Sequence, residues 1–160
     1  MGGMPATTSF TTEIEIAAPP AAVWSALTQQ SGRRRWLNDA EVTSSWTPGA
    51  PIAIDVVLEG REWHDRGTVV EAEPGCLLSY SLWSEVSRRS DVPEHRSIVT
   101  FRLAGLDGGG TLLQLVHARL TAGAAGPHAA FFWPVALRGL RDLVEGRPPA
   151  LALGLDETRA

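Results

Sequence analysis

The sequence FFWPVALRGLRDLVEG, residues Phe131 to Gly146, has the pattern of one amphipathic helix that follows a long run of strand-like segments. At helical spacing its apolar side chains share one face and its charged side chains share the other. The apolar face comprises Trp133, Leu137, Leu140 and Val144, with Phe132, Ala136 and Leu143 beside them. A single helix late in the chain can bury such a face only against the sheet that the preceding strands form.

Proline and glycine mark the predicted limits of this helix. Pro134 has no amide hydrogen and clashes with the carbonyl four residues earlier, so the helix either begins with Pro134 in its first turn or bends there. Gly146 is typical of a helix end, and Pro148 and Pro149 oppose any continuation.

The first part of the chain predicts one strand and two short helices. Residues 10–16 alternate as a half-buried strand, and helical segments follow at about 20–28 and 31–37. In the second helix we expect Trp36 and Leu37 to face inward. The run from Arg33 to Arg35 is expected to form a solvated surface.

From residue 40 onward the hydrophobic pattern has a period of two, which indicates strands. The predicted strands are 40–45, 52–59, 61–72, 77–83, 95–103 and 111–120. We expect a bend at Gly67 in the third of them. Short turns such as Pro74-Gly75 join the strands, which must therefore be antiparallel.

Length and composition predict one domain, residues 8–147, with flexible termini at 1–7 and 148–160. The chain has 160 residues, of which 44% are hydrophobic, so it can bury a sizeable core. A net charge of −4 without a basic face excludes nucleic acid as a partner. The chain lacks a signal peptide pattern and an apolar run of the ~20 residues that span a membrane, so we expect a cytoplasmic protein without membrane insertion.

Four segments resemble the helix-grip superfamily, which includes START domains, birch-pollen-type allergens and polyketide cyclases. Within it the chain is most similar to bacterial relatives of the C-terminal domain of the Hsp90 ATPase activator. The segments are Ile14 to Thr28, Gly67-x-Val69 leading to Pro74 and Leu78, Gly109 to His117, and Trp133 to Gly146. The resemblance implies an α+β fold in which a curved antiparallel sheet of about six to seven strands surrounds the C-terminal helix and leaves a cavity between them.

Twelve side chains are candidates for binding a ligand in that cavity, because they lie on elements that border it or share inward strand parity. They are Trp36, Trp46, Ile54, Val56, Trp63, Tyr80, Leu82, Phe101, His117, Phe132, Trp133 and Leu137. Tryptophan rings bury roughly 150–250 Å² each, which suits both a packed core and an aromatic ligand. For Tyr80 and His117 a packed core position with one satisfied hydrogen bond competes with a ligand contact.

Catalytic and metal sites find little support in the sequence. Four scattered histidines show no ligand spacing, and the single Cys76 allows neither an intramolecular disulfide nor a cysteine metal cluster. His64 and Asp65 are neighbours on a strand and must face opposite sides, and Asp65 is expected in a solvated rim. We therefore expect no catalytic residue, metal or cofactor.

The leading hypothesis is a monomeric or weakly dimeric protein that binds a hydrophobic small molecule, with aromatic or polycyclic rings, for carriage, sequestration or self-resistance. Two alternatives stay open. One is a polyketide cyclase or aromatase in which Tyr80, His117 or Asp65 moves protons. The other is an Hsp90-type co-chaperone module.

Overall fold

The alternating segments form one antiparallel sheet in the computed structural model, which describes residues 7–30, 32–121 and 125–147. The strand order is β1-β8-β7-β6-β5-β4-β3-β2. The strands are β1 (Thr7–Ile16), β2 (Arg33–Arg34), β3 (Ala40–Thr43), β4 (Pro51–Leu58), β5 (Arg61–Glu73), β6 (Leu77–Trp83), β7 (Ser97–Gly105) and β8 (Thr111–Thr121). The predicted α+β helix-grip class is confirmed, but the described residues contain eight strands rather than six to seven.

The additional strand is β2, which the sequence predicted as part of a helix at 31–37. Its two residues, Arg33 and Arg34, pair with Glu41 and Ala40 of β3. A single 3₁₀ turn, η1 (Arg35–Leu37), follows it. A strand of two residues is too short to show alternation in a sequence, which explains why the helical prediction fails at this place.

Two α-helices accompany the sheet: α1 (Pro20–Leu27) and α2 (Ala125–Val144). The loop between β6 and β7 contains two further 3₁₀ turns, η2 (Glu85–Ser87) and η3 (Pro93–His95). α2 begins six residues before Phe131, and Pro134 lies inside it, so a restart at Pro134 is wrong. Pro127 in the first turn is compatible with this earlier beginning, because the amide hydrogen that it lacks would have no partner within the helix.

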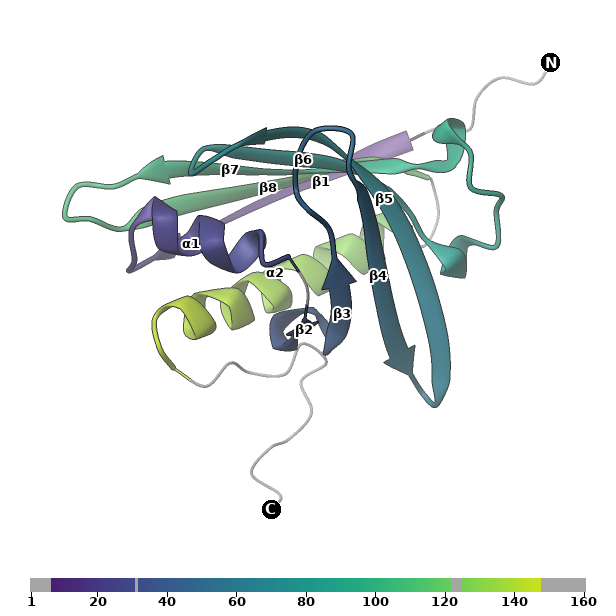
Figure 1. Cartoon of the computed structure of the whole chain (residues 1–160), viewed down its shortest axis with the longest axis horizontal. Coiled ribbons are helices and arrows are strands. Elements are labelled where there is room, and N and C mark those ends of the chain that lie inside the picture. The colour runs from purple at the N-terminus through teal and green to yellow at the C-terminus, as the bar shows by residue number, and fades with distance from the viewer. Residues whose placement is uncertain (1–6, 31, 122–124, 148–160) are drawn as a thin grey trace.

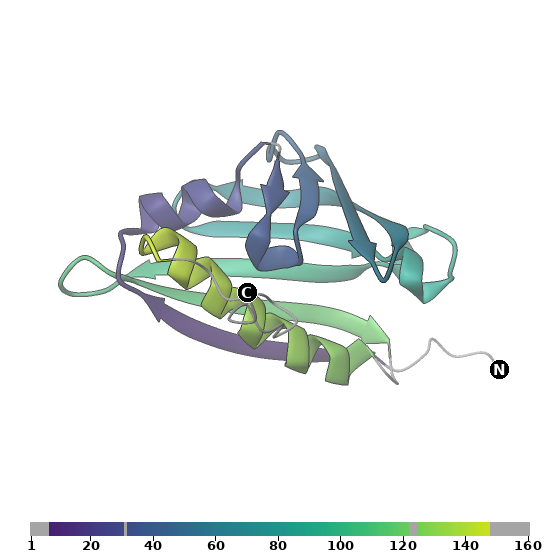
Figure 2. The same cartoon turned by 90° about the horizontal axis from the view of Figure 1, so that it is seen from below.

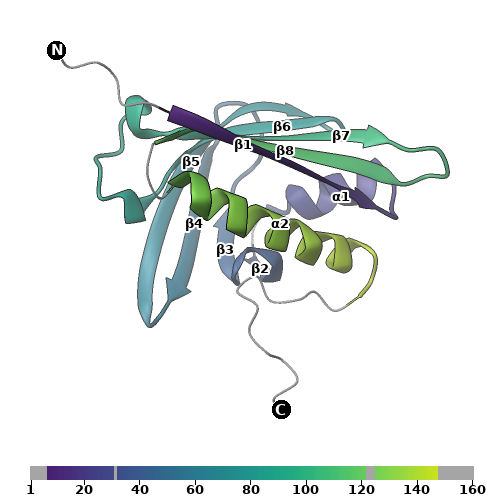
Figure 3. The same ribbon diagram turned by 180° about the vertical axis from the view of Figure 1, so that it is seen from behind.

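The sheet curves around α2, and α1 lies beside the C-terminal half of that helix (Figure 1 and Figure 2). β1 and β8 run along α2 on one side, as Figure 3 shows from behind. Trp133, Leu137 and Leu140 of α2 are buried against the concave side of the sheet, whereas Leu143 is 44% exposed. The predicted apolar face is therefore correct at its centre and too wide at Leu143.

The ends of the described chain differ slightly from the predicted domain limits. Residues 1–6 and 148–160, which we expected to be flexible, lie outside the described residues. Thr7, which the prediction included in the N-terminal tail, is instead the first residue of β1 and pairs with Thr121 of β8.

Gly67 allows β5 and β6 to approach each other closely. A Cβ atom at this position would lie 2.3 Å from the carbonyl oxygen of Ser81, far inside van der Waals contact. β5 continues through Gly67, and the irregularity in its pairing with β6 falls between Val69 and Glu71 instead. The close approach of the two strands thus gives a packing reason for glycine at this position.

We expect Gly67→Ala to lower the free energy of unfolding by about 1–3 kcal/mol, because the added methyl group must push two paired strands apart. Urea denaturation measures this loss. Gly105→Ala in β7 is the matched control, since its Cβ would meet Pro20 Cγ at an ordinary 3.9 Å. Equal stability of the Gly67→Ala protein and the wild type would contradict the close approach.

Candidate functional site

The space between the concave side of the sheet and the helices contains a cavity of only about 10 Å³. Such a volume holds one water molecule at most, whereas pockets for drug-sized ligands measure ~300–1,000 Å³. The cavity is lined by Leu27, Arg34, Trp36, Leu37, Val42, Trp46, Ile54, Leu78, Tyr80 and Phe101. The open hollow that the resemblance implied is therefore almost closed by side chains.

Aromatic side chains fill this interior in a continuous row that leads from the cavity to the surface of α2. The neighbours along the row are Trp46, Tyr80, Phe101, Trp133, Phe132 and His128. Their ring centroids are 5.1–6.4 Å apart, and most pairs meet edge to face, the geometry that aromatic quadrupoles favour. The row occupies the space between sheet and helix in which a ligand would lie.

Trp46 closes one end of the row and is held in an unusual backbone conformation. Its φ angle is +57°, a value that few non-glycine residues adopt. Its indole Nε1 donates a hydrogen bond to the carbonyl of Gln29 at 2.8 Å, and its ring meets Tyr80 edge to face. The backbone amide of Trp46 donates a second hydrogen bond, to Ser44 Oγ. These contacts place the Trp46 ring in the wall of the cavity.

Arg34 lines the same cavity and is only 4% exposed, which contradicts the prediction of a solvated arginine run. The alternation of β2 explains the error, because Arg33 and Arg35 on either side are exposed. Its Nη1 and Nη2 atoms donate to the carbonyls of Leu27 and Gln29 at 2.9 and 2.6 Å. Its guanidinium group lies over the Trp46 ring at 5.3 Å. Burial lowers the pKa of Arg34.

Tyr80 contributes the second polar group of the cavity. Its ring is buried between Trp46 and Phe101, and burial raises the pKa of its hydroxyl far above the usual value. No hydrogen bond joins this hydroxyl to another residue of the described chain. Tyr80 is thus a core residue, but the described residues do not supply the backbone carbonyl that the core interpretation expected for its hydroxyl.

His117 is buried, with 9% of its surface exposed, and both of its ring nitrogens have partners. Trp133 Nε1 donates to His117 Nδ1 at 3.0 Å, so the proton of the neutral ring is on Nε2. Nε2 donates to Ser97 Oγ at 2.8 Å, and the serine hydroxyl donates to the carbonyl of Leu82. Burial, with a smaller effect from the charge of His128, lowers the pKa of His117 to about 4.

Five of the twelve predicted site residues line the cavity, namely Trp36, Trp46, Ile54, Tyr80 and Phe101. The other seven do not line it: Val56, Trp63, Leu82, His117, Phe132, Trp133 and Leu137. Sequence reasoning missed Leu27, Arg34, Leu37, Val42 and Leu78. Leu78 could have been predicted from the sequence, because it has the same strand parity as Tyr80. No sequence pattern indicated that Arg34 faces inward.

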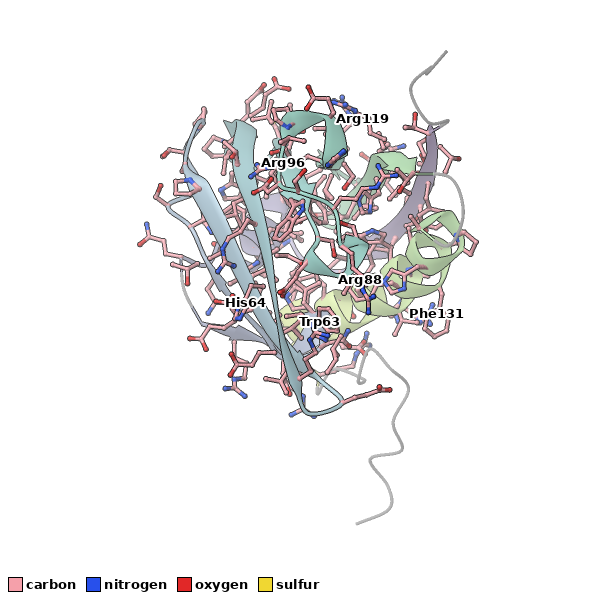
Figure 4. The ribbon with its side chains drawn as sticks, turned by 90° about the vertical axis from the view of Figure 1, so that its right-hand side faces the viewer. Trp63, His64, Arg88, Arg96, Arg119 and Phe131 are labelled. Atoms are coloured by element: carbon pink, nitrogen blue, oxygen red, sulfur yellow. The ribbon has the colours of Figure 1, made fainter. Side chains whose placement is uncertain are left out.

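The β4–β5 hairpin carries two polar groups on opposite sides. Figure 4 shows Trp63 and His64 on opposite sides of the hairpin, and Asp65 lies on the same side as Trp63. His64 Nδ1 is 2.8 Å from Asp55 Oδ1, and this hydrogen bond raises the pKa of His64. Asp65 Oδ1 accepts the amide of Glu85, and burial raises its pKa, so Asp65 is half-buried and less solvated than the predicted rim.

A second hollow, of about 390 Å³, lies on the outer side of the sheet. It is lined by Thr68, Ser81, Asp91, Pro93, Arg96, Ile98 and Arg119. Arg96 holds both oxygens of Asp91 and also donates to Thr68 and Ser81, so its charge and its donors are occupied. Figure 4 shows two of these lining residues, Arg96 and Arg119, at the top of the view.

The described residues contain no cluster of side chains able to hold a metal ion. None of the helices among the described residues is long and apolar enough to cross a membrane.

A curved antiparallel sheet around a long C-terminal helix, with an interior lined by aromatic side chains, defines the helix-grip class of proteins. The family model described as activator of Hsp90 ATPase homolog 1-like protein matches residues 17–145. The chain belongs to this family, as the sequence resemblance implied.

Solved structures with this fold support the assignment. CalU16 from Micromonospora echinospora is 27% identical, with a TM-score of 0.65 over 89% of this chain and 77% of that chain. A Cytophaga hutchinsonii protein is 24% identical, with a TM-score of 0.69 over 87% and 94%. The Aha1 dimer from Colwellia psychrerythraea is 19% identical, with a TM-score of 0.62 over 93% and 99%. Among curated protein sequences, none matches this chain.

The depressed pKa of His117 predicts a loss of stability in acid. The unfolded chain binds a proton near pH 6.5 and the folded chain only near pH 4, so stability falls as the pH drops through this window, by up to about 3 kcal/mol. Urea denaturation at pH 7 and pH 4 measures the loss, and His117→Gln is expected to reduce it. An equal loss in the two proteins would show that His117 does not titrate in this way.

Proposed function

We propose that this protein binds a hydrophobic ligand with aromatic or polycyclic rings between the concave side of its sheet and α2. The observation that carries the proposal is the row of aromatic side chains that runs from Trp46 to Phe132 through this interior. Flat apolar rings offer faces and edges on which a ligand ring packs well. Carriage, sequestration and self-resistance are the roles that such binding serves.

Because the cavity measures about 10 Å³, the ligand enters only if one wall moves. The wall formed by β2, η1 and β3 is the easiest to displace, since it is the edge of the sheet and only three residue pairs join β3 to β4. Asn38, Asp39 and Trp46 in and beside this wall all have positive φ angles. Such conformations cost about 1–3 kcal/mol each and are concentrated at functional sites.

The geometry favours binding over catalysis. Both nitrogens of His117 are engaged with Trp133 and Ser97, so neither is available to accept a proton from a ligand. Burial raises the pKa of Tyr80, which makes its hydroxyl a poor acid at neutral pH. A cyclase or aromatase that relied on these two groups would need a different arrangement of the interior.

Family membership supports a second candidate function, the stimulation of an Hsp90-type ATPase. Our proposal predicts that this chain leaves the ATPase rate of a purified Hsp90 unchanged, because the binding site that we describe is internal. A coupled ATPase assay with the full chain measures this rate. Saturable stimulation would favour the co-chaperone function.

The ligand proposal predicts saturable binding of N-phenyl-1-naphthylamine, a neutral aromatic probe whose emission rises in apolar surroundings. Ile54→Trp is expected to weaken this binding about tenfold, because the larger side chain fills the cavity wall. Fluorescence titration measures the affinity, and quenching of tryptophan emission reports proximity to the aromatic row.

Val57→Trp is the matched control for that substitution. Val57 lies on the same strand as Ile54, but its side chain is 62% exposed and does not line the cavity. We expect the control protein to bind the probe like the wild type. Absence of probe binding by the wild type, or equal weakening by both substitutions, would contradict an internal site.

A further inference from the structure

Arg34 is a buried cation without an acidic partner. Its side chain is 4% exposed, and no carboxylate of the described residues forms an ion pair with it. Burial of an unpaired charge is costly, and proteins usually compensate it with an opposite charge. Tyr80 is the group whose negative form would raise the pKa of Arg34, but its own pKa is raised far above neutrality, so it stays uncharged at pH 7.

The backbone contacts of Arg34 explain only part of its position. Two of its nitrogens donate to the carbonyls of Leu27, the last residue of α1, and of Gln29 just after it, where a cation stabilises the end of a helix. Its Nε atom is buried and has no hydrogen-bond partner. If Arg34 only stabilised the end of α1, its Nε donor would stay without a partner, which costs about 1–3 kcal/mol.

Tyr80 lines the same cavity and supplies a second donor without a partner among the described residues. The remaining lining side chains are apolar except for the indole N–H groups of Trp36 and Trp46, and that of Trp46 already donates to Gln29. The cavity is thus bordered by the Tyr80 hydroxyl, by the unpaired Nε donor and the positive charge of Arg34, and by no carboxylate. An anionic oxygen is the group that satisfies all three.

We infer that Arg34 and Tyr80 bind the carboxylate of an aromatic acid, whose rings pack against the aromatic row. This inference rests on the proposed function and specifies the chemical class of its ligand. The Trp46 ring, over which the guanidinium group lies, provides a flat wall beside the charge. A basic ligand is disfavoured, because Arg34 would repel its positive charge and no lining residue carries a negative one.

A matched pair of compounds tests the inference: 2-naphthoate, which is an anion at pH 7, and 2-naphthamide, which has the same shape without the charge. We expect the wild-type protein to bind 2-naphthoate at least about tenfold more tightly, as measured by isothermal titration calorimetry. Equal affinities would overturn the role of Arg34 and leave the proposed function intact. Absence of binding by both compounds and by N-phenyl-1-naphthylamine would instead contradict the proposed function.

Three variants locate the preference. Tyr80→Phe retains the ring and removes a hydroxyl that has no partner, so it should fold normally and reduce the preference for 2-naphthoate several-fold. Arg34→Gln should abolish the preference, and Arg33→Gln, at the exposed neighbouring position, should retain it. If Arg34→Gln does not fold, Tyr80→Phe alone decides. An unchanged preference in the Tyr80→Phe protein would overturn the inference.

Discussion

The contact between the apolar face of α2 and the concave side of the sheet is the interaction on which the rest of the structure depends. Trp133 lies at its centre, where it packs edge to face against Phe101 and donates a hydrogen bond to His117. This one side chain joins the helix to β7 and β8. Trp133 contacts the aromatic row that extends to Trp46 beside Arg34, so its packing affects the space that remains in the cavity.

The interior combines tight packing with incomplete polar satisfaction. Aromatic side chains close the space to about 10 Å³, which favours stability because cavities cost dispersion contacts. The unpaired Nε of Arg34 has the opposite effect, because a buried donor without an acceptor is unfavourable. Arg34 and Tyr80 both border this small cavity. A stability requirement alone would favour apolar residues at these two positions, which is why we connect them with binding.

Helix α2 and the long strands could be predicted because each presents a regular pattern over many residues. The apolar positions of α2 and the alternation of β4 to β8 indicated which faces are buried. The start of α2 was missed because residues 125–130 carry no apolar stripe. The inward parity of Tyr80 and Phe101 was correct, whereas Arg34 was assigned to the surface because charged residues are seldom buried without a partner.

The sequence by itself determined the fold class and the face of α2 that packs on the sheet. The hydrophobic pattern changes from a period of two to helical spacing, which leaves α2 only one surface on which to pack. It also limited the chemistry to an aromatic interior with few polar groups. Only the tertiary structure decided that the interior is nearly filled and that Arg34 faces it. Ring packing across strands and the direction of a two-residue strand arise from contacts between segments distant in the chain, and no local pattern records them.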